Sequence, residues 1–280
     1  MTRMKDGVNA SSGETPPRKG LAAFGSGTLI GTLGGLIGLG GAEFRLPLLI
    51  GVFRFGALDA VILNKAMSLV VVASALPFRA DAVPLGLVAA HWTIVINLLC
   101  GSLVGAWLGA GWATRLDSLS LYRIISVLLV VIAAILLFGH DASSRGPLLD
   151  GAWLAAAGVV LGLVIGIVAS LLGVAGGELL IPTLVLVFGL DIKLAGSLAL
   201  AVSLPTMLAG FVRYSQDRSF AVLGRNRSFV LIMAGGSILG SFIGGRLLGI
   251  IPDGVLLPML AAILAVSAVK VWIQRPRGSS

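Results

Sequence analysis

One lysine lies inside an otherwise apolar stretch of the chain and is the sharpest candidate for binding chemistry. Lys65 is in the run Leu58–Phe78, with Asn64 beside it and Ser68 three positions further on. Residues about one helical turn apart share a helix face, so these three side chains are expected to point into one cavity. An ammonium with amide and hydroxyl donors suits a small anion. The alternative is a lysine whose long side chain reaches the membrane interface.

Two glutamates occupy matching places after glycine-rich breaks. Glu43 lies in GLGGAEFRLP, and Glu178 lies in GVAGGELLIP. An ionisable residue inside a membrane is costly to bury and is by default a functional candidate, here a carboxyl group that carries a proton. The alternative is that each carboxylate stabilises the first turn of a helix, where the helix dipole is positive.

The glycines of these breaks allow sharp turns and close approach of another group. A short helix follows each break, and its first N–H groups have no partner within the helix. Two such N-termini facing each other would form an anion site, as they do at the midplane of secondary transporters. The alternative is that the glycines only allow close helix packing.

The other candidates come from comparing the two copies of the motif. Arg45 has no counterpart, because Leu180 replaces it, and it is either a second anion contact or the ion-pair partner of an acidic group. Ser203 matches Ser68. The candidate substrate-binding residues are therefore Gly40, Gly41, Glu43, Asn64, Lys65, Ser68, Gly176, Gly177, Glu178 and Ser203, with Arg45, Pro47 and Pro182 as secondary candidates. No catalytic residue, metal ligand or cofactor is predicted, because no catalytic or metal-binding motif is found.

The elements that must position these residues belong in a membrane. Of 280 residues, 57% are hydrophobic and only 11% are charged, against about 25% charged in a soluble domain. A soluble enzyme or a nucleic-acid-binding domain is nearly excluded, although the net charge is +8. The basic residues lie between the apolar runs and at the termini, which is typical of membrane proteins.

Eight runs are long enough to cross a bilayer as helices. They are Leu21–Leu39, Leu58–Phe78, Leu85–Ala113, Leu121–Phe138, Ala152–Val174, Leu194–Val212, Phe229–Ile250 and Val255–Trp272. Two shorter runs, Glu43–Phe53 and Glu178–Phe188, cover only about 16 Å as helix. They are predicted to be half-helices or re-entrant segments, which need protein or a hydrated cavity around them.

The chain is duplicated. A shift of 135 residues places Gly38 on Gly173 and Gly101 on Gly236, and it holds without a gap across most of each half. The predicted fold is an all-α integral membrane protein, a polytopic helical bundle of two halves with four or five segments each. The expected order is a disordered cytoplasmic tail (1–20), a first repeat (21–139), a linker (140–150), a second repeat (151–272) and a second cytoplasmic tail (273–280). Five segments per half would make the repeats inverted and four would make them parallel. The distribution of basic residues leaves both open, with a slight preference for inverted.

The duplicated glycine–glutamate–proline motif resembles that of the sulfite exporter TauE/SafE family of membrane permeases. The similarity extends from Leu21 to Trp272, with Ala42 and Ala175 interrupting the glycine run expected of the family and Arg45 as a further departure. The resemblance implies transport of small sulfur-containing anions, such as sulfite or an organosulfonate. It implies a multi-pass protein of the inner (plasma) membrane, and the basic residues near both ends place both termini in the cytoplasm.

The first hypothesis is therefore a secondary transporter of small anions, with a coupling proton and the lipid bilayer as partners and no nucleic acid. One alternative is a proton-linked cation or metal carrier that uses Glu43 and Glu178 as ligands. Another is a membrane scaffold subunit that transports nothing. The spaced glycines from Gly101 to Gly109 and from Gly236 to Gly244 form close-packing faces, within the bundle or in a homodimer.

Overall fold

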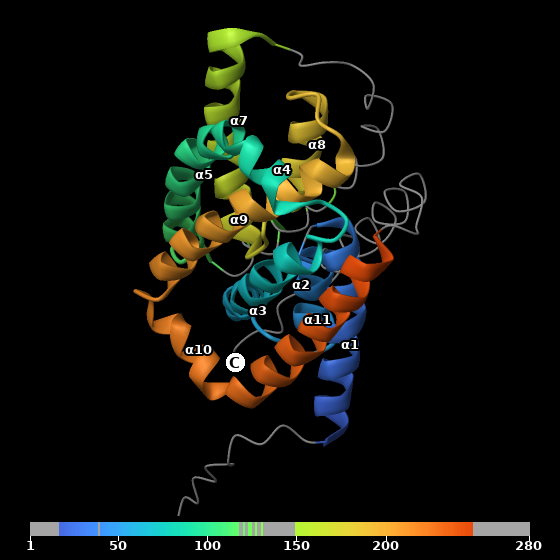
Figure 1. Ribbon diagram of the computed structural model, residues 1–280. Helices are drawn as coiled ribbons and strands as arrows, with labels where there is room; N and C mark the ends of the chain where they lie inside the picture. Colours follow the sequence, from blue (N-terminus) through green and yellow to red (C-terminus); the bar gives the residue numbers. More distant parts are fainter. Residues whose placement is uncertain are drawn as a thin grey trace, which may run out of the picture.

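The computed structural model describes residues 17–38, 40–117 and 149–248, together with a few single positions between 120 and 130. All regular elements in these ranges are helical (Figure 1). Five of the described helices, α3, α5, α7, α9 and α11, are long and apolar enough to cross a membrane. The prediction of a polytopic all-α membrane protein is confirmed. Two predicted segments, Leu121–Phe138 and Val255–Trp272, fall almost or wholly outside the described residues, as do most of the linker and both tails.

The same series of helices occurs twice. The first half contains α1 (Pro17–Ile37), α2 (Ala42–Gly51), α3 (Ala57–Phe78), α4 (Leu85–Ala90) and α5 (Trp92–Ala113). The second contains α7 (Gly151–Leu172), α8 (Gly177–Leu186), α9 (Ile192–Tyr214), a 3-10 turn at 218–220, α10 (Ala221–Arg225) and α11 (Arg227–Leu247). The shift of 135 residues places α2 on α8 residue for residue, so the duplication in the sequence is a duplication of helices.

Two differences from the predicted segments have local causes. The run Leu85–Ala113 is not one helix, because the backbone leaves the helical region at His91 between α4 and α5. Helix α1 begins at Pro17, four residues before the predicted apolar run. Proline suits the first position of a helix, where its missing N–H is not needed and its φ is already helical.

The first helix of each half packs against a helix of the other half. Helix α1 packs along α11, with Gly27, Gly31 and Gly35 against the backbone of Met233, Ser237 and Ser241. Helix α5 packs along α7 in the same way, with Gly101, Gly105 and Gly109 against Val159, Leu163 and Ile167. At each of these glycines a Cβ atom would collide with the facing backbone, so the small residues are what allow the helices to approach so closely.

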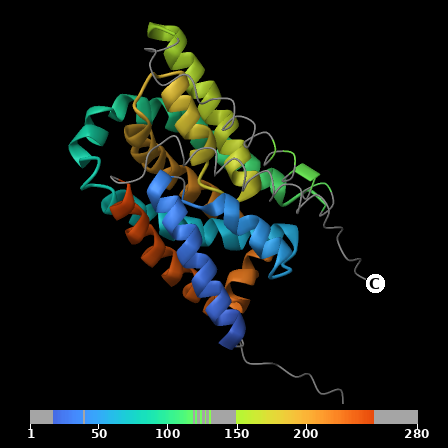
Figure 2. The same ribbon diagram turned by 90° about the vertical axis from the view of Figure 1, so that its right-hand side faces the viewer.

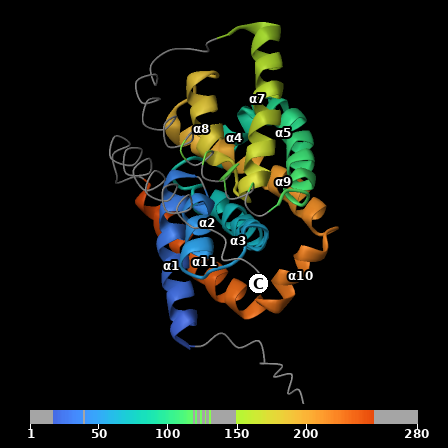
Figure 3. The ribbon, with the colours of Figure 1, turned by 180° about the vertical axis from the view of Figure 1, so that it is seen from behind.

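Equivalent helices of the two halves run in opposite directions. Helix α1 starts at the bottom of the molecule and runs upward, whereas α7 starts at the top and runs downward (Figures 1 and 3). The glycine contacts advance in step along both chains, so α1 is parallel to α11 and α5 is parallel to α7. The two helix pairs are seen from the side in Figure 2. The halves thus adopt the inverted arrangement.

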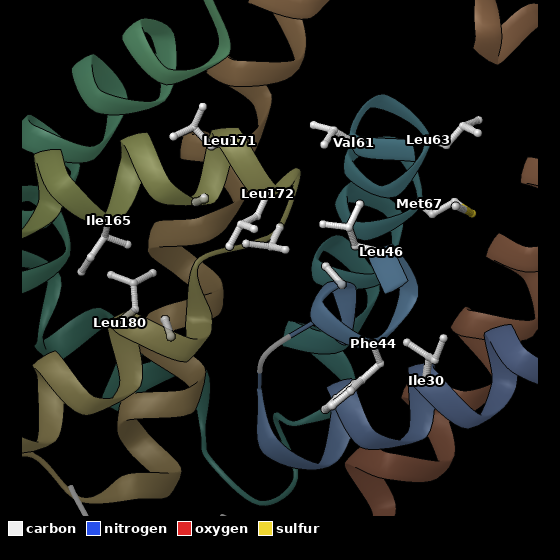
Figure 4. Packing of buried hydrophobic residues seen from close by; sticks show 14 of the residues in the cluster. Ile30, Phe44, Leu46, Val61, Leu63, Met67, Ile165, Leu171, Leu172 and Leu180 are labelled. Carbon is white, nitrogen blue, oxygen red and sulfur yellow. The ribbon is translucent and has the colours of Figure 1, made fainter. Parts of the chain in front are cut away.

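The two half-helices α2 and α8 begin at glycines with left-handed backbone. The residues before their first turns, Gly41 and Gly176, have φ of 66° and 81°, a region that costs other residues free energy but not glycine. Each half-helix then buries apolar side chains in the shared core, where Phe44 and Leu46 of α2 and Leu180 of α8 lie close to α3 and α7 (Figure 4).

Candidate functional site

Helix α3 carries three polar side chains into the centre of the protein. Asn64, Lys65 and Ser68 are all fully buried. They lie in the middle third of a 22-residue helix whose other buried residues are apolar. Sequence reasoning placed these three side chains in one cavity. The structure buries all three, but each contacts a different part of the protein.

Lys65 reaches across to the second half. Its Nζ donates a hydrogen bond to Oγ of Ser170, near the end of α7, at 3.2 Å. The amine also lies against α9 at Gly210, where a Cβ atom would stand 2.8 Å from both Nζ and the Ser170 Oγ. Gly210 thus leaves the room that the lysine occupies. Among the described residues no carboxylate forms an ion pair with Lys65, although an ammonium in a membrane interior usually has one.

Arg45 connects three helices at a second buried position. From α2 its guanidinium donates to Oγ of Ser68 on α3 at 2.8 Å and to Oγ of Ser237 on α11 at 3.2 Å. The side chain is fully buried. In the second half Leu180 takes its place, and there Ser102, which matches Ser237, forms a 2.7 Å hydrogen bond with Thr206 instead. At these two equivalent positions, the buried positive charge therefore occurs only in the first half.

Asn64 joins the start of one half-helix to the end of the helix before the other. Its Nδ2 donates to the carbonyl of Ala42, the first residue of α2, at 3.0 Å, and to that of Leu172, the last residue of α7, at 3.4 Å. Its Oδ1 is buried, and no donor in the described part of the chain reaches it. The amide thus fixes the two breaks relative to α3 and leaves one acceptor available.

The two breaks meet at the centre of the molecule. A Cβ atom at Gly40, in the first break, would lie 3.5 Å from Cβ of its counterpart Ala175 in the second. Each break also packs on the opposite half, Gly38 against the backbone of Gly196 in α9 and Gly173 against that of Val61 in α3. The N-termini of α2 and α8 therefore both begin beside this contact.

The remaining candidates surround the breaks. Glu178 is fully buried in the first turn of α8, and within the described residues neither carboxyl oxygen has a hydrogen-bond partner. The same is true of the Ser203 hydroxyl. The backbone of Glu43 lies in α2, but its side chain is outside the described part of the structure. Gly177 opens α8, and Pro47 and Pro182 lie inside α2 and α8.

Sequence reasoning missed Arg79, which directly follows the predicted run Leu58–Phe78. The side chain is buried, and its guanidinium donates to the carbonyls of Gly35 and Leu36 at 3.0 Å each and to that of Lys193 at 3.1 Å. The acceptors belong to the ends of α1 and α9, and only the folded structure brings them to the end of α3. Ser170, Ser237 and Tyr214 were also missed, and their only signal was a polar residue in an apolar run.

The chemistry of the site favours negative ligands. The donors are an ammonium, a guanidinium, serine hydroxyls and helix N-termini, all of which suit oxyanions. No group of three or more metal-ligating side chains occurs within the described ranges. Outside the membrane helices, the hydrogen bonds that Ser219 donates to Asp217 lower the pKa of that loop carboxyl.

Inverted halves, paired broken helices and a polar centre define a secondary-transporter type of membrane protein. The model of the sulfite exporter TauE/SafE family matches residues 17–271, nearly the whole chain, so the protein belongs to this family of membrane transporters. Searches of curated proteins and of solved structures gave no match. The family membership confirms the resemblance noted in the sequence.

Proposed function

We propose that this protein is a secondary transporter of small anions, sulfite or an organosulfonate, whose substrate binds between the halves near the N-termini of α2 and α8. The observation that carries the proposal is Lys65, a fully buried lysine that the described residues provide with one hydroxyl and no carboxylate. A buried ammonium without a counter-ion is costly by several kcal/mol. An anion beside it would offset that cost.

The contact between the breaks supports the same position for the substrate. Two half-helices start beside Gly40 and Ala175, and each has unpaired N–H groups and a positive dipole end there. The hydroxyls of Ser68 and Ser203 are the neighbouring donors, and Gly41, Gly176 and Gly177 let a ligand approach the backbone. Asn64, whose two N–H groups bond to carbonyls, holds the two breaks in position. Arg45 adds a second positive charge on the first half.

Coupling to protons is assigned to the two matched glutamates. Glu178 lies in the first turn of α8 with no hydrogen-bond partner among the described residues, so it is well suited to hold a proton when an anion is near. Glu43 has the equivalent position in α2. Neutralising either carboxyl would remove its repulsion of an anionic substrate. A metal carrier has no observation in its favour within the described ranges, where no metal-binding group occurs.

The surroundings of the transporter belong to the proposal as well. We place it in the inner (plasma) membrane with both termini in the cytoplasm, following the basic residues near both ends. The glycine faces of α1, α5, α7 and α11 are used within one chain. A homodimer would therefore form through other surfaces.

Uptake into proteoliposomes tests the function directly. Purified protein would be reconstituted, and entry of labelled sulfite and of a labelled sulfonate would be followed with and without an imposed pH gradient, against protein-free vesicles. Saturable uptake that an excess of unlabelled anion inhibits, and that changes with the gradient, is expected. Folded protein that moves neither anion would overturn the proposal.

A further inference from the structure

Ser170 occupies an unusual position at the boundary between the halves. It lies near the end of α7 and is fully buried. Its Oγ accepts the hydrogen bond from Lys65, and its main-chain carbonyl accepts a 2.8 Å hydrogen bond from the hydroxyl of Tyr214 on α9. Tyr214 is itself buried. Ser170 is thus held from two sides, by a lysine from the first half and a tyrosine from the second.

The hydroxyl of Ser170 still has a hydrogen to donate. Its oxygen accepts from an ammonium, so its own O–H must point elsewhere. Other serines in membrane helices, such as Ser26 and Ser74, donate back to the carbonyl four residues earlier. Ser170 makes no such bond within the described part of the chain. The Lys65 ammonium likewise has three N–H groups and one protein acceptor among the described residues.

The pair has no counterpart at the symmetry-related position. The residue equivalent to Lys65 is Leu200, and the one equivalent to Ser170 is Gly35. The pair also differs from the Arg45 group, whose guanidinium already bridges two serines on different helices. The Lys65 ammonium and the Ser170 hydroxyl are adjacent donors, and each has at least one hydrogen that no acceptor in the described residues receives.

We propose that Lys65 and Ser170 together bind the oxygen atoms of one oxyanion per chain, and that Tyr214 is a positioning residue that holds Ser170 in place. The inference rests on the proposed function and adds a residue of the second half to the site. The ligand is an anion with at least two oxygens on one centre, because the ammonium and the hydroxyl lie side by side and each can reach a different oxygen. The symmetry-related position, formed by Leu200 of α9 and Gly35 of α1, binds no second anion.

Substitutions at Ser170 test the pair. In Ser170→Ala the half-saturating concentration (KM) for sulfite uptake should rise about tenfold, the loss of one hydrogen bond to a charged group. The maximal rate should change much less. Ser170→Cys keeps the size but donates weakly and should behave like the alanine variant, whereas Ser170→Thr keeps the hydroxyl and should stay within about twofold of wild type. Tyr214→Phe should raise KM by a smaller factor, and it should not add to Ser170→Ala.

A matched control is Ser102→Ala, which removes a buried serine that hydrogen-bonds to Thr206 and not to Lys65 or Ser170. Its KM should equal that of wild type. Calorimetric titration of the purified protein with sulfite should give one site per chain, and heat should be reduced in Ser170→Cys. If the wild-type protein transports sulfite and both Ser170→Ala and Ser170→Cys have the wild-type KM, this inference is overturned and the proposed function stands. Two sulfite sites per chain would also overturn it. Wild type that neither binds nor transports either anion would instead remove the proposed function.

Discussion

Arg79 and Tyr214 occupy equivalent positions in the two halves, and each donates a hydrogen bond to the carbonyl of an equivalent residue. Arg79 donates to Gly35 near the end of α1, and Tyr214 donates to Ser170 near the end of α7. Both carbonyls belong to the last turn of a helix that stops at a break, where carbonyl groups have no partner within the helix. In both halves a carbonyl in the last helical turn thus receives a side-chain hydrogen bond, from a guanidinium in the first half and from a phenol in the second.

Removing Arg79 should destabilise the protein strongly. Arg79→Met leaves two buried carbonyls and one part-buried carbonyl without their donor, and each buried orphaned group costs about 1–3 kcal/mol. We expect a loss of at least about 2 kcal/mol, measured as a large fall in melting temperature in detergent. Arg79→Lys retains part of the hydrogen bonding and should lose less. An Arg79→Met protein as stable as wild type would contradict the structural role of this side chain.

Lys65→Ala should abolish anion uptake without unfolding the protein. The substitution removes a buried charge that costs free energy in the apo protein, which offsets part of the cost of the cavity left by the truncated side chain, so the protein should still fold. The measurements are uptake in proteoliposomes and elution as a single peak in size-exclusion chromatography. Lys193→Ala removes a lysine at the start of α9 and should transport normally. Full uptake by the Lys65→Ala variant would take this residue out of the site.

Glu178→Gln should separate transport from the proton gradient. The amide resembles the protonated carboxyl in size and cannot release a proton. We expect anion uptake that persists but no longer responds to an imposed pH gradient, with the same test applied to Glu43→Gln. Asp81→Asn, at an exposed position, should keep the wild-type response. If both glutamine variants remain as sensitive to the gradient as wild type, another group carries the proton.

The loop after α9 should not contribute to the pH dependence of uptake near neutrality. Hydrogen bonds from Ser219 lower the pKa of Asp217, so its contribution to stability is present above the ordinary value of about 3.9 and is lost as pH falls through the lower folded value. Asp217→Asn should therefore leave the pH dependence of uptake unchanged over the physiological range, about pH 5 to pH 8. A shifted profile would show that this loop takes part in coupling.

The glycine contacts should be sensitive to a single added methyl group. A Cβ atom at Gly105 would collide with the carbonyl of Leu163. Overpacking of this kind costs about 1–3 kcal/mol, so Gly105→Ala should lower the melting temperature in detergent. Gly235 lies in the same type of helix with nothing within 4 Å of its Cβ position, and Gly235→Ala should not destabilise. Equal effects of the two substitutions would mean that α5 and α7 are not in close contact.

The breaks and half-helices were predictable because glycine-rich segments and short apolar runs can be read directly from the sequence. The predicted run Glu43–Phe53 lies within two residues of α2, and the duplication identified α8 by the same evidence. The partners of Lys65 were not predictable. Ser170 is an ordinary serine in an apolar run until α7 is placed against α3, and nothing near Arg79 in the sequence shows that the end of α1 lies beside it.

Close packing of α1 on α11 has a consequence for biogenesis. Helix α1 leaves the ribosome first among the described helices, but the surface that fits its glycines is synthesised last among them. Until then Gly27, Gly31 and Gly35 face lipid or a temporary neighbour. The first half therefore cannot complete its own packing as it is made, and assembly must wait until α11 has entered the bilayer. Chains truncated before α11 should leave α1 without its neighbour and become substrates for membrane quality control.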